Sequence, residues 1–141
     1  MNEDSHEDIL VNTNQLPWIP IAEGIDYRIL RTSKETGVWT VLFRAQAGSS
    51  FAPHKHLGAG EYYMIKGHMK YRGGEARTGD YGYEPLGVVH EKTDFPEYTE
   101  LYYTNFGPVV FLDDDGGVDT VLDHEFIESH AEDYLKQQKS A

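Results

Sequence analysis

Two histidines separated by a single residue, His54 and His56, constrain this chain more than any other feature. They lie between Gly48 and Gly67, just before a run of strand-forming residues over 62–65. Side chains alternate between the two faces of a β-strand, so both imidazoles are expected on one face, with their backbones roughly 6.6 Å apart. Two imidazole rings at that spacing can converge on one metal ion. The pair therefore predicts a strand that supplies two metal ligands.

A second block of residues supplies a third candidate ligand. Gly79 is followed after five residues by a Pro-Leu-Gly turn at 85–87, and after two more by His90. Taken in order, the two blocks resemble the paired sequence motifs of the cupin superfamily. The second motif is matched from Gly79 to His90, and only its last position differs, with an aspartate in place of asparagine. The resemblance implies that His54, His56 and His90 bind one metal.

The acidic position of the first motif is displaced by one residue. The family places a carboxylate seven residues before the closing Gly67, where this chain has Gly60, and Glu61 follows it. A shift of one residue turns a side chain to the opposite face of a strand. Without a bulge, Glu61 points away from His54 and His56, and the metal keeps three neutral ligands. With a bulge, Glu61 becomes a fourth ligand.

Composition excludes several classes of partner. The chain of 141 residues has 24 acidic and 12 basic residues and a net charge of -12, which argues against nucleic acid or an anionic membrane as partner. It has no cysteine, so neither a disulfide nor a thiolate site is available. No apolar run approaches the roughly 18 residues that a membrane span needs, and the N-terminus lacks a secretory signal pattern. We expect a cytoplasmic protein without nucleic-acid or membrane partners.

The remaining pattern predicts short strands followed by one helix. Strand character is found over residues 27–31, 38–45, 68–72, 81–84, 101–106 and 109–112, with turns at 33–37, 73–74 and 113–117. From Asp123 to about Lys136, apolar residues recur at helical spacing, and Asp123 is the expected N-cap. We predict an all-β, cupin-type jelly-roll barrel with a short C-terminal helix. A flexible acidic segment is expected over 1–15 and a single cupin domain over 16–141.

Within the cupins, the chain resembles the acetylacetone-cleaving dioxygenases, non-haem iron enzymes that split β-diketones with O2. The resemblance runs from about Trp39 to Val118 and is carried by residues 47–52, 60–62, 66–67, 72–75 and 106–114. It implies cleavage of a C–C bond of a β-dicarbonyl substrate, giving a carboxylate and an α-oxo-carbonyl product. It also implies Fe(II) as the metal, although zinc, nickel or another divalent ion suits histidine nitrogens equally well.

The same resemblance assigns roles around the metal. Arg72, Glu84 and Thr93 match a polar group that orients the substrate and tunes the metal. A buried ion pair between Arg72 and Glu84 and a surface ion pair between them remain open alternatives. The substrate pocket is expected to include Tyr62, Leu101 and Asn105.

One pocket strand departs from the family. Two phenylalanines line the pocket in the relatives, and the matching positions here are Leu101 and Asn105. An amide in place of a ring makes the pocket roomier and adds hydrogen-bonding groups. We therefore hypothesise that a small apolar diketone is a poor substrate.

Two other classes of function compete with the dioxygenase. One is a metal-binding cupin that senses or binds a ligand without redox chemistry. The other is a zinc-dependent hydrolase or isomerase in which metal-bound water is the reagent. For assembly, the segment around Trp18, bracketed by Pro17 and Pro20, and the apolar residues on both faces of several strands predict a homodimer or homotetramer.

Overall fold

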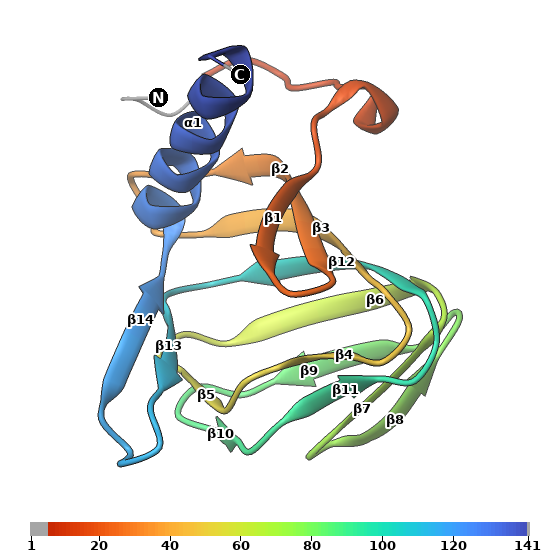
Figure 1. The fold of residues 1–141 in the computed structure, drawn as a ribbon. Coiled ribbons are helices and arrows are strands. Elements are labelled where there is room, and N and C mark those ends of the chain that lie inside the picture. The colour runs from red at the N-terminus through yellow and green to blue at the C-terminus, as the bar shows by residue number, and fades with distance from the viewer. Residues whose placement is uncertain (1–5, 141) are drawn as a thin grey trace.

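The strand-rich pattern of the sequence is present in the structure, a computed structural model that describes residues 6–140 (Figure 1). The strands in this range are β1 (Ile19–Ala22), β2 (Ile25–Thr32), β3 (Trp39–Ala45), β4 (Ser49–Phe51), β5 (His54–His56), β6 (Gly60–Lys66), β7 (His68–Tyr71), β8 (Gly74–Arg77), β9 (Tyr81–Glu84), β10 (Val89–His90), β11 (Thr93–Phe95), β12 (Thr99–Asn105), β13 (Val109–Leu112) and β14 (Val118–Leu122). One 3-10 turn, η1 (Thr13–Gln15), precedes them, and the helix α1 (His124–Ser140) follows them.

The strands form antiparallel sheets that close into a barrel. One sheet has the order β1-β2-β3-β12-β6-β9, and two smaller sheets have the orders β10-β5-β13-β14 and β4-β11-β7-β8. Figure 1 shows the large sheet crossing the molecule, the short strands below it, and α1 at the top beside β2. The predicted all-β cupin barrel with a C-terminal helix is thus confirmed.

The alternation within β3 explains how the barrel obtains its core. Trp39, Val41 and Phe43 are buried on the inner face, as side-chain alternation along a strand requires. The outer residues of β3 are only half-buried. Because β12 pairs with β3 along its whole length, its alternate residues face the same interior.

The helix α1 begins where the sequence predicts. The Asp123 Oδ1 accepts a hydrogen bond of 2.8 Å from the Phe126 backbone N–H, which makes Asp123 the N-cap. The Tyr27 hydroxyl on β2 donates to the Ile127 carbonyl at 3.1 Å and lies 2.7 Å from Nδ1 of His130. His130 is therefore a packing contact of the helix. The helix ends at Ser140 rather than near Lys136, because its last residues are good helix formers.

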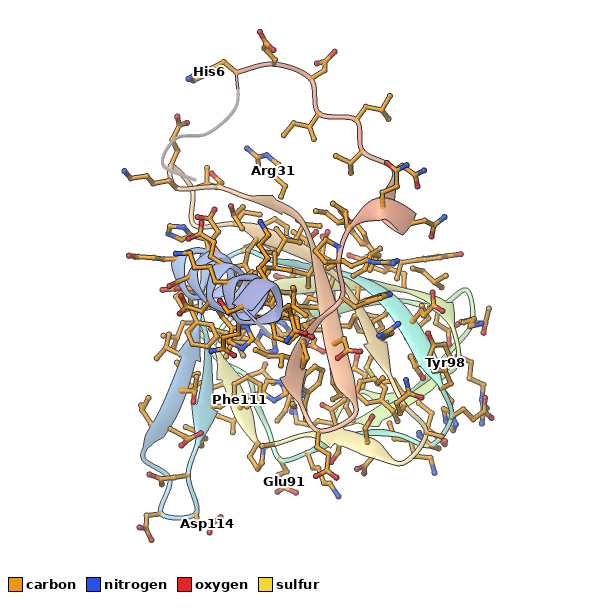
Figure 2. All side chains as sticks on the ribbon, turned by 45° about the horizontal axis from the view of Figure 1, so that its top comes forward. His6, Arg31, Glu91, Tyr98, Phe111 and Asp114 are labelled. Atoms are coloured by element: carbon orange, nitrogen blue, oxygen red, sulfur yellow. The ribbon has the colours of Figure 1, made fainter. Side chains whose placement is uncertain are left out.

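Two segments differ from the sequence expectation in informative ways. Strand β14 follows the predicted turn at 113–117, with Asp114 at the tip of the β13–β14 hairpin (Figure 2). It was not predicted, because its residues are mostly exposed and polar ones interrupt its apolar pattern. Strand β1 contains Pro20, which the edge of the sheet tolerates. Trp18, just before it, lies under the guanidinium groups of Arg28 and Arg44, 4.0 and 4.5 Å from the ring centroid.

The N-terminal segment is described only in part. Residues 1–5 of the predicted flexible segment 1–15 lie outside the described residues, and the boundary at residue 16 stays a prediction. Figure 2 shows His6 at the far end of this segment, away from the barrel. No helix in residues 6–140 is long and apolar enough to cross a membrane.

Candidate metal centre

Strand register brings three imidazoles together inside the barrel. In β5, His54 and His56 are buried and Lys55 between them is exposed, as alternation requires. Strand β10 pairs with β5 so that His90 lies opposite His54. The ring centroids are 5.3 Å apart for His54 and His56, 5.0 Å for His54 and His90, and 5.2 Å for His56 and His90. Histidines distant in sequence therefore form one buried cluster.

The ring nitrogens of this cluster are available to a cation. Nδ1 of His54 lies 2.9 Å from the Ala52 carbonyl, which fixes the ring and leaves Nε2 to the interior. Among residues 6–140, the four ring nitrogens of His56 and His90 have no hydrogen-bond partner. Burial lowers the pKa of His54 to about 4 and also lowers the pKa of His90. Neutral buried imidazoles with free nitrogens have the form that binds a divalent metal.

A carboxylate from β9 completes the cluster. Glu84 Oε2 lies 2.6 Å from Nε2 of His56, without hydrogen-bond alignment, and 3.5 Å from Nε2 of His90. The ligand atoms of His54, His56, Glu84 and His90 all lie within 4.8 Å of one another. Burial alone raises the pKa of Glu84, but the contacts with His56 and the Tyr103 hydroxyl outweigh it and hold that pKa below its ordinary value. The carboxylate oxygen and the imidazole nitrogens are the atom types that bind a divalent cation, so the arrangement suits a bound cation.

Glu61 is not part of this cluster. It lies on the other face of β6, half-buried, where its carboxylate accepts a hydrogen bond from the Tyr81 hydroxyl. The one-residue offset in the sequence therefore has the predicted consequence. On the inner face stands Gly60, which pairs with Glu84 on β9 and with Asn105 on β12. The carboxylate near the histidines thus comes from β9 instead of β6.

The side chain of Tyr103 fills the space beside Gly60. A Cβ atom at Gly60 would lie only 2.7 Å from the Tyr103 hydroxyl oxygen. That hydroxyl donates a short hydrogen bond to Glu84 Oε2. Burial raises the pKa of Tyr103 well above its ordinary value, so the phenol keeps its proton. A glycine at this position is what allows Tyr103 to reach Glu84.

Three rings are stacked behind the cluster. Tyr103 lies nearly parallel to His56, with centroids 6.4 Å apart, and Tyr62 stacks on Tyr103 at 5.9 Å. Gly82 on β9 makes room for this arrangement, because a Cβ there would lie 2.1 Å from the Tyr62 ring. The Tyr62 hydroxyl donates to Tyr71 at 2.8 Å. The stack holds the ring of His56 in place.

The cluster opens onto a cavity of about 50 Å³. Its polar lining consists of His54, His56, Glu84, Thr93, Tyr103 and Asn105, and its apolar lining consists of Trp39, Phe43, Phe51, Met69, Leu101, Val109, Phe111 and Leu122. Four of the residues expected around the metal or in the substrate pocket therefore face this space: Glu84, Thr93, Leu101 and Asn105. Tyr62 does not line it and lies behind Tyr103.

Arg72 is placed differently from the rest of its predicted group. It is exposed in the turn after β7, and Glu84 makes its contacts with His56, His90 and Tyr103. The alternative of a buried Arg72–Glu84 ion pair is therefore not realised in residues 6–140, because the Gly-Gly turn at 73–74 carries Arg72 to the surface.

Comparison with known proteins places this site in a family. Residues 6–110 match the family described as ChrR Cupin-like domain. The acetylacetone-cleaving enzyme of Acinetobacter johnsonii is 46% identical over 112 residues, covering 72% of this chain and 73% of the relative. The chain is a cupin of the acetylacetone-cleaving dioxygenase family. As a member it belongs to the metal-dependent enzymes among the cupins.

Solved structures of this cupin family have the same fold. The acetylacetone dioxygenase of Acinetobacter johnsonii superimposes with a TM-score of 0.83 at 34% identity, covering 95% of this chain and 96% of that one. A protein of Methylibium petroleiphilum PM1 described as a candidate acetylacetone dioxygenase gives 0.83 at 36% identity, covering 92% and 97%. An RmlC-like cupin of Ralstonia eutropha JMP134 gives 0.82 at 21% identity over 96% and 89%, which shows the shared fold alone.

Tyr103 is the residue of this cupin's site that the sequence interpretation missed. Leu101 and Asn105 were assigned to the pocket strand, and Tyr103 lies between them at the same parity. Alternation along β12 places all three on the inner face, where all three are buried. The signal was therefore present in the spacing. What the spacing did not reveal is the gap at Gly60 that lets the ring reach across to β9.

We predict that Gly60→Ala weakens metal binding. The added methyl group displaces Tyr103 and with it Glu84, so metal affinity should fall about ten- to hundredfold, the usual cost of losing an outer-sphere partner. Tyr103→Phe, which removes only the hydroxyl, should act in the same direction. Competition with a chromogenic chelator measures the affinity, with Glu61→Ala on the outer face as the control. Wild-type affinity in Gly60→Ala would show that Tyr103 does not hold the site.

Proposed function

We propose that this cupin is a non-haem iron(II) dioxygenase that cleaves a C–C bond of a β-dicarbonyl substrate with O2. One carbonyl fragment leaves as a carboxylate and the other as an α-oxo-carbonyl compound, so both oxygen atoms of O2 enter the products. The observation that carries the proposal is the buried cluster of three imidazoles and Glu84, of which His54, His56 and Glu84 line a small, mostly apolar cavity. The acetylacetone-cleaving relative supports the substrate class.

In this proposal, His54, His56 and His90 hold the metal. An imidazole that coordinates a metal is an uncharged ligand, so three of them leave the full double charge of the ion in place, whereas a carboxylate ligand would cancel one unit. When bound, iron(II) supplies a Lewis acid for the enolate form of the substrate and a redox-active partner for O2. Zinc or nickel would fit the same three nitrogens, so the identity of the metal is decided by analysis of the purified protein.

Glu84 is proposed to handle the proton. It lines the cavity beside the three rings, and its Oε2 accepts from Tyr103, which fixes the direction of the carboxylate. A carboxylate held there can accept the acidic proton on the carbon between two carbonyl groups. Thr93 also lines the cavity, and we propose that its hydroxyl orients a substrate oxygen. Arg72 contributes from the surface, where its charge acts on His90.

The apolar walls are proposed to bind the hydrocarbon ends of the substrate and to exclude water. Phe43, Phe51 and Phe111 form a cluster of rings next to His54, with centroid distances of 5.1 to 6.4 Å among neighbouring pairs. Leu101 closes the wall on the side of β12. An environment of this kind strengthens the interaction between a cation and an enolate, because little solvent screens it. Tyr62 supports the site from behind, through its contacts with Tyr103 and Tyr71.

The test is metal content and O2 uptake in matched variants. His54→Ala, His56→Ala and His90→Ala should each abolish metal binding, because a cage of three neutral nitrogens cannot spare a ligand. Glu61→Gln should keep both metal and activity. Glu84→Gln should keep metal yet lose about a hundredfold or more in kcat, the usual contribution of a positioned general base. Iron content is matched by elemental analysis before O2 consumption with a β-diketone panel is recorded.

The competing functions give different results in the same assay. A zinc-dependent hydrolase or isomerase would contain zinc and would convert substrate without consuming O2. A cupin that only binds a ligand would bind diketones without turnover. Metal loss in Glu61→Gln as severe as in the histidine variants would contradict the three-histidine assignment.

We also propose that two copies associate through the outer face of the large sheet. Tyr102, Tyr63 and Tyr81 are neighbours in register across β12, β6 and β9, and their exposed fractions are 40%, 49% and 63%. Tyrosines are enriched at protein interfaces. A two-fold axis through this row of tyrosines would bring the rows of the two copies into contact without opposing charges of the same sign. Two chains that each carry a net charge of -12 can approach most easily along such a row.

Sedimentation velocity at micromolar concentration tests this association. We expect wild type to sediment as a dimer or larger, and Tyr63→Glu to dissociate, because it places like charges in the interface. Val118→Glu, a change of another exposed apolar residue on β14, should leave the association intact. A monomeric wild type, or a Tyr63→Glu variant that stays associated, contradicts the proposal.

A further inference from the structure

Asn105 carries a buried acceptor that the protein does not satisfy. The residue ends β12 on the inner face, and its side chain is 2% exposed. Its Oδ1 has no hydrogen-bond partner among residues 6–140. Buried amide oxygens are almost always paired, and leaving one unpaired destabilises the folded protein. Such a group in a cavity wall indicates a ligand that completes it.

The donors nearest to Asn105 along the sheet are already used. The indole N–H of Trp39, its register partner on β3, donates to the Gly107 carbonyl at 3.1 Å. The hydroxyl of Tyr103, two residues earlier on the same face, donates to Glu84. The register partner of Asn105 on β6 is Gly60, which has no side chain. The amide oxygen therefore depends on a donor that enters the cavity.

The same cavity contains the metal cluster. Asn105, Gly60 and Glu84 form one row across β12, β6 and β9. Two strand spacings separate the ends of that row, about 10 Å between backbones, and both outer side chains project into the cavity between them. A small molecule whose carbonyl groups lie at the cluster thus extends toward Asn105. Apolar residues, Leu101 and Val109 among them, provide most of the remaining lining.

We infer that Asn105 determines substrate specificity by accepting a hydrogen bond from a hydroxyl or N–H group of the substrate. The substrate class is then a small β-dicarbonyl that carries one further donor, and a plain alkyl diketone is a poor fit. A site built to pair with a donor discriminates strongly against the analogue that lacks it, because the protein group is left unpaired in that complex. This inference rests on the proposed function, since it takes the dicarbonyl part of the substrate from it.

The test compares two diketones of equal size. One is acetylacetone in which a terminal methyl group carries a hydroxyl, and the other carries a methyl group on the same carbon. Wild type should bind the hydroxylated compound at least about tenfold more tightly under anaerobic calorimetry of the metal-loaded protein, and the ratio of kcat/KM should follow. In Asn105→Leu the preference should disappear or reverse. If the leucine variant folds poorly, Asn105→Ala replaces it: the ratio of the two affinities is measured in the same way, and the preference should again disappear.

Thermal stability supplies an independent readout. If Oδ1 is unpaired, Asn105→Leu removes a destabilising group at similar volume and should raise the Tm of the ligand-free protein by a few degrees. A residue with a merely structural role would give the opposite sign. Thr104→Val is the control on the outer face of β12, where its hydroxyl bonds Thr40 and Tyr102, and it should leave the substrate preference unchanged.

The outcomes separate this inference from the proposed function. Tighter binding of the hydroxylated compound that is lost in Asn105→Leu supports the inference, even if no O2 is consumed and the dioxygenase proposal fails. The inference is overturned by equal binding of the two compounds to wild type, by an unchanged ratio in Asn105→Leu, or by a lower Tm of that variant. If O2 is nevertheless consumed, the dioxygenase proposal still stands. Failure of both diketones to bind overturns both the inference and the proposed function.

Discussion

Three buried imidazoles whose nitrogens face one another are the constraint on which the rest of this structure depends. His54, His56 and His90 lie at ring separations near 5 Å, and both ring nitrogens of His56 and of His90 lack a hydrogen-bond partner within residues 6–140. Buried polar atoms are costly unless they are bound, so a cation among the rings would stabilise the cluster. The barrel supplies the rigidity this needs, because β5 and β10 hold the three histidines through a paired register.

The position of the carboxylate follows from a single glycine. Gly60 occupies the inner-face position of β6, the ring of Tyr103 fills the room it leaves, and the phenol holds Glu84 from β9. In this way a carboxylate lies beside the metal cluster while its direction is fixed by a hydrogen bond. We infer that this separation lets three neutral ligands keep the charge of the ion and leaves Glu84 to accept a proton.

Much of this could be predicted from the sequence because it depends on local periodicity. Alternation placed His54 and His56 on one face and turned Glu61 outward. The N-cap at Asp123 is equally local. The rest depends on contacts between distant residues: that Asn105 is unpaired is decided by the indole of Trp39 donating to Gly107, and the reach of Tyr103 is decided by Gly60 on a neighbouring strand. The exposure of Arg72 depends on how the turn after β7 projects, which spacing alone does not give.

X-ray absorption at the iron edge of the anaerobically loaded protein tests the central claim most directly, because it counts the ligands of the metal. Three imidazoles and no protein carboxylate are expected, and the spectrum of Glu84→Gln should match that of wild type. Fewer than three imidazoles, or loss of an oxygen ligand in Glu84→Gln, would contradict the account.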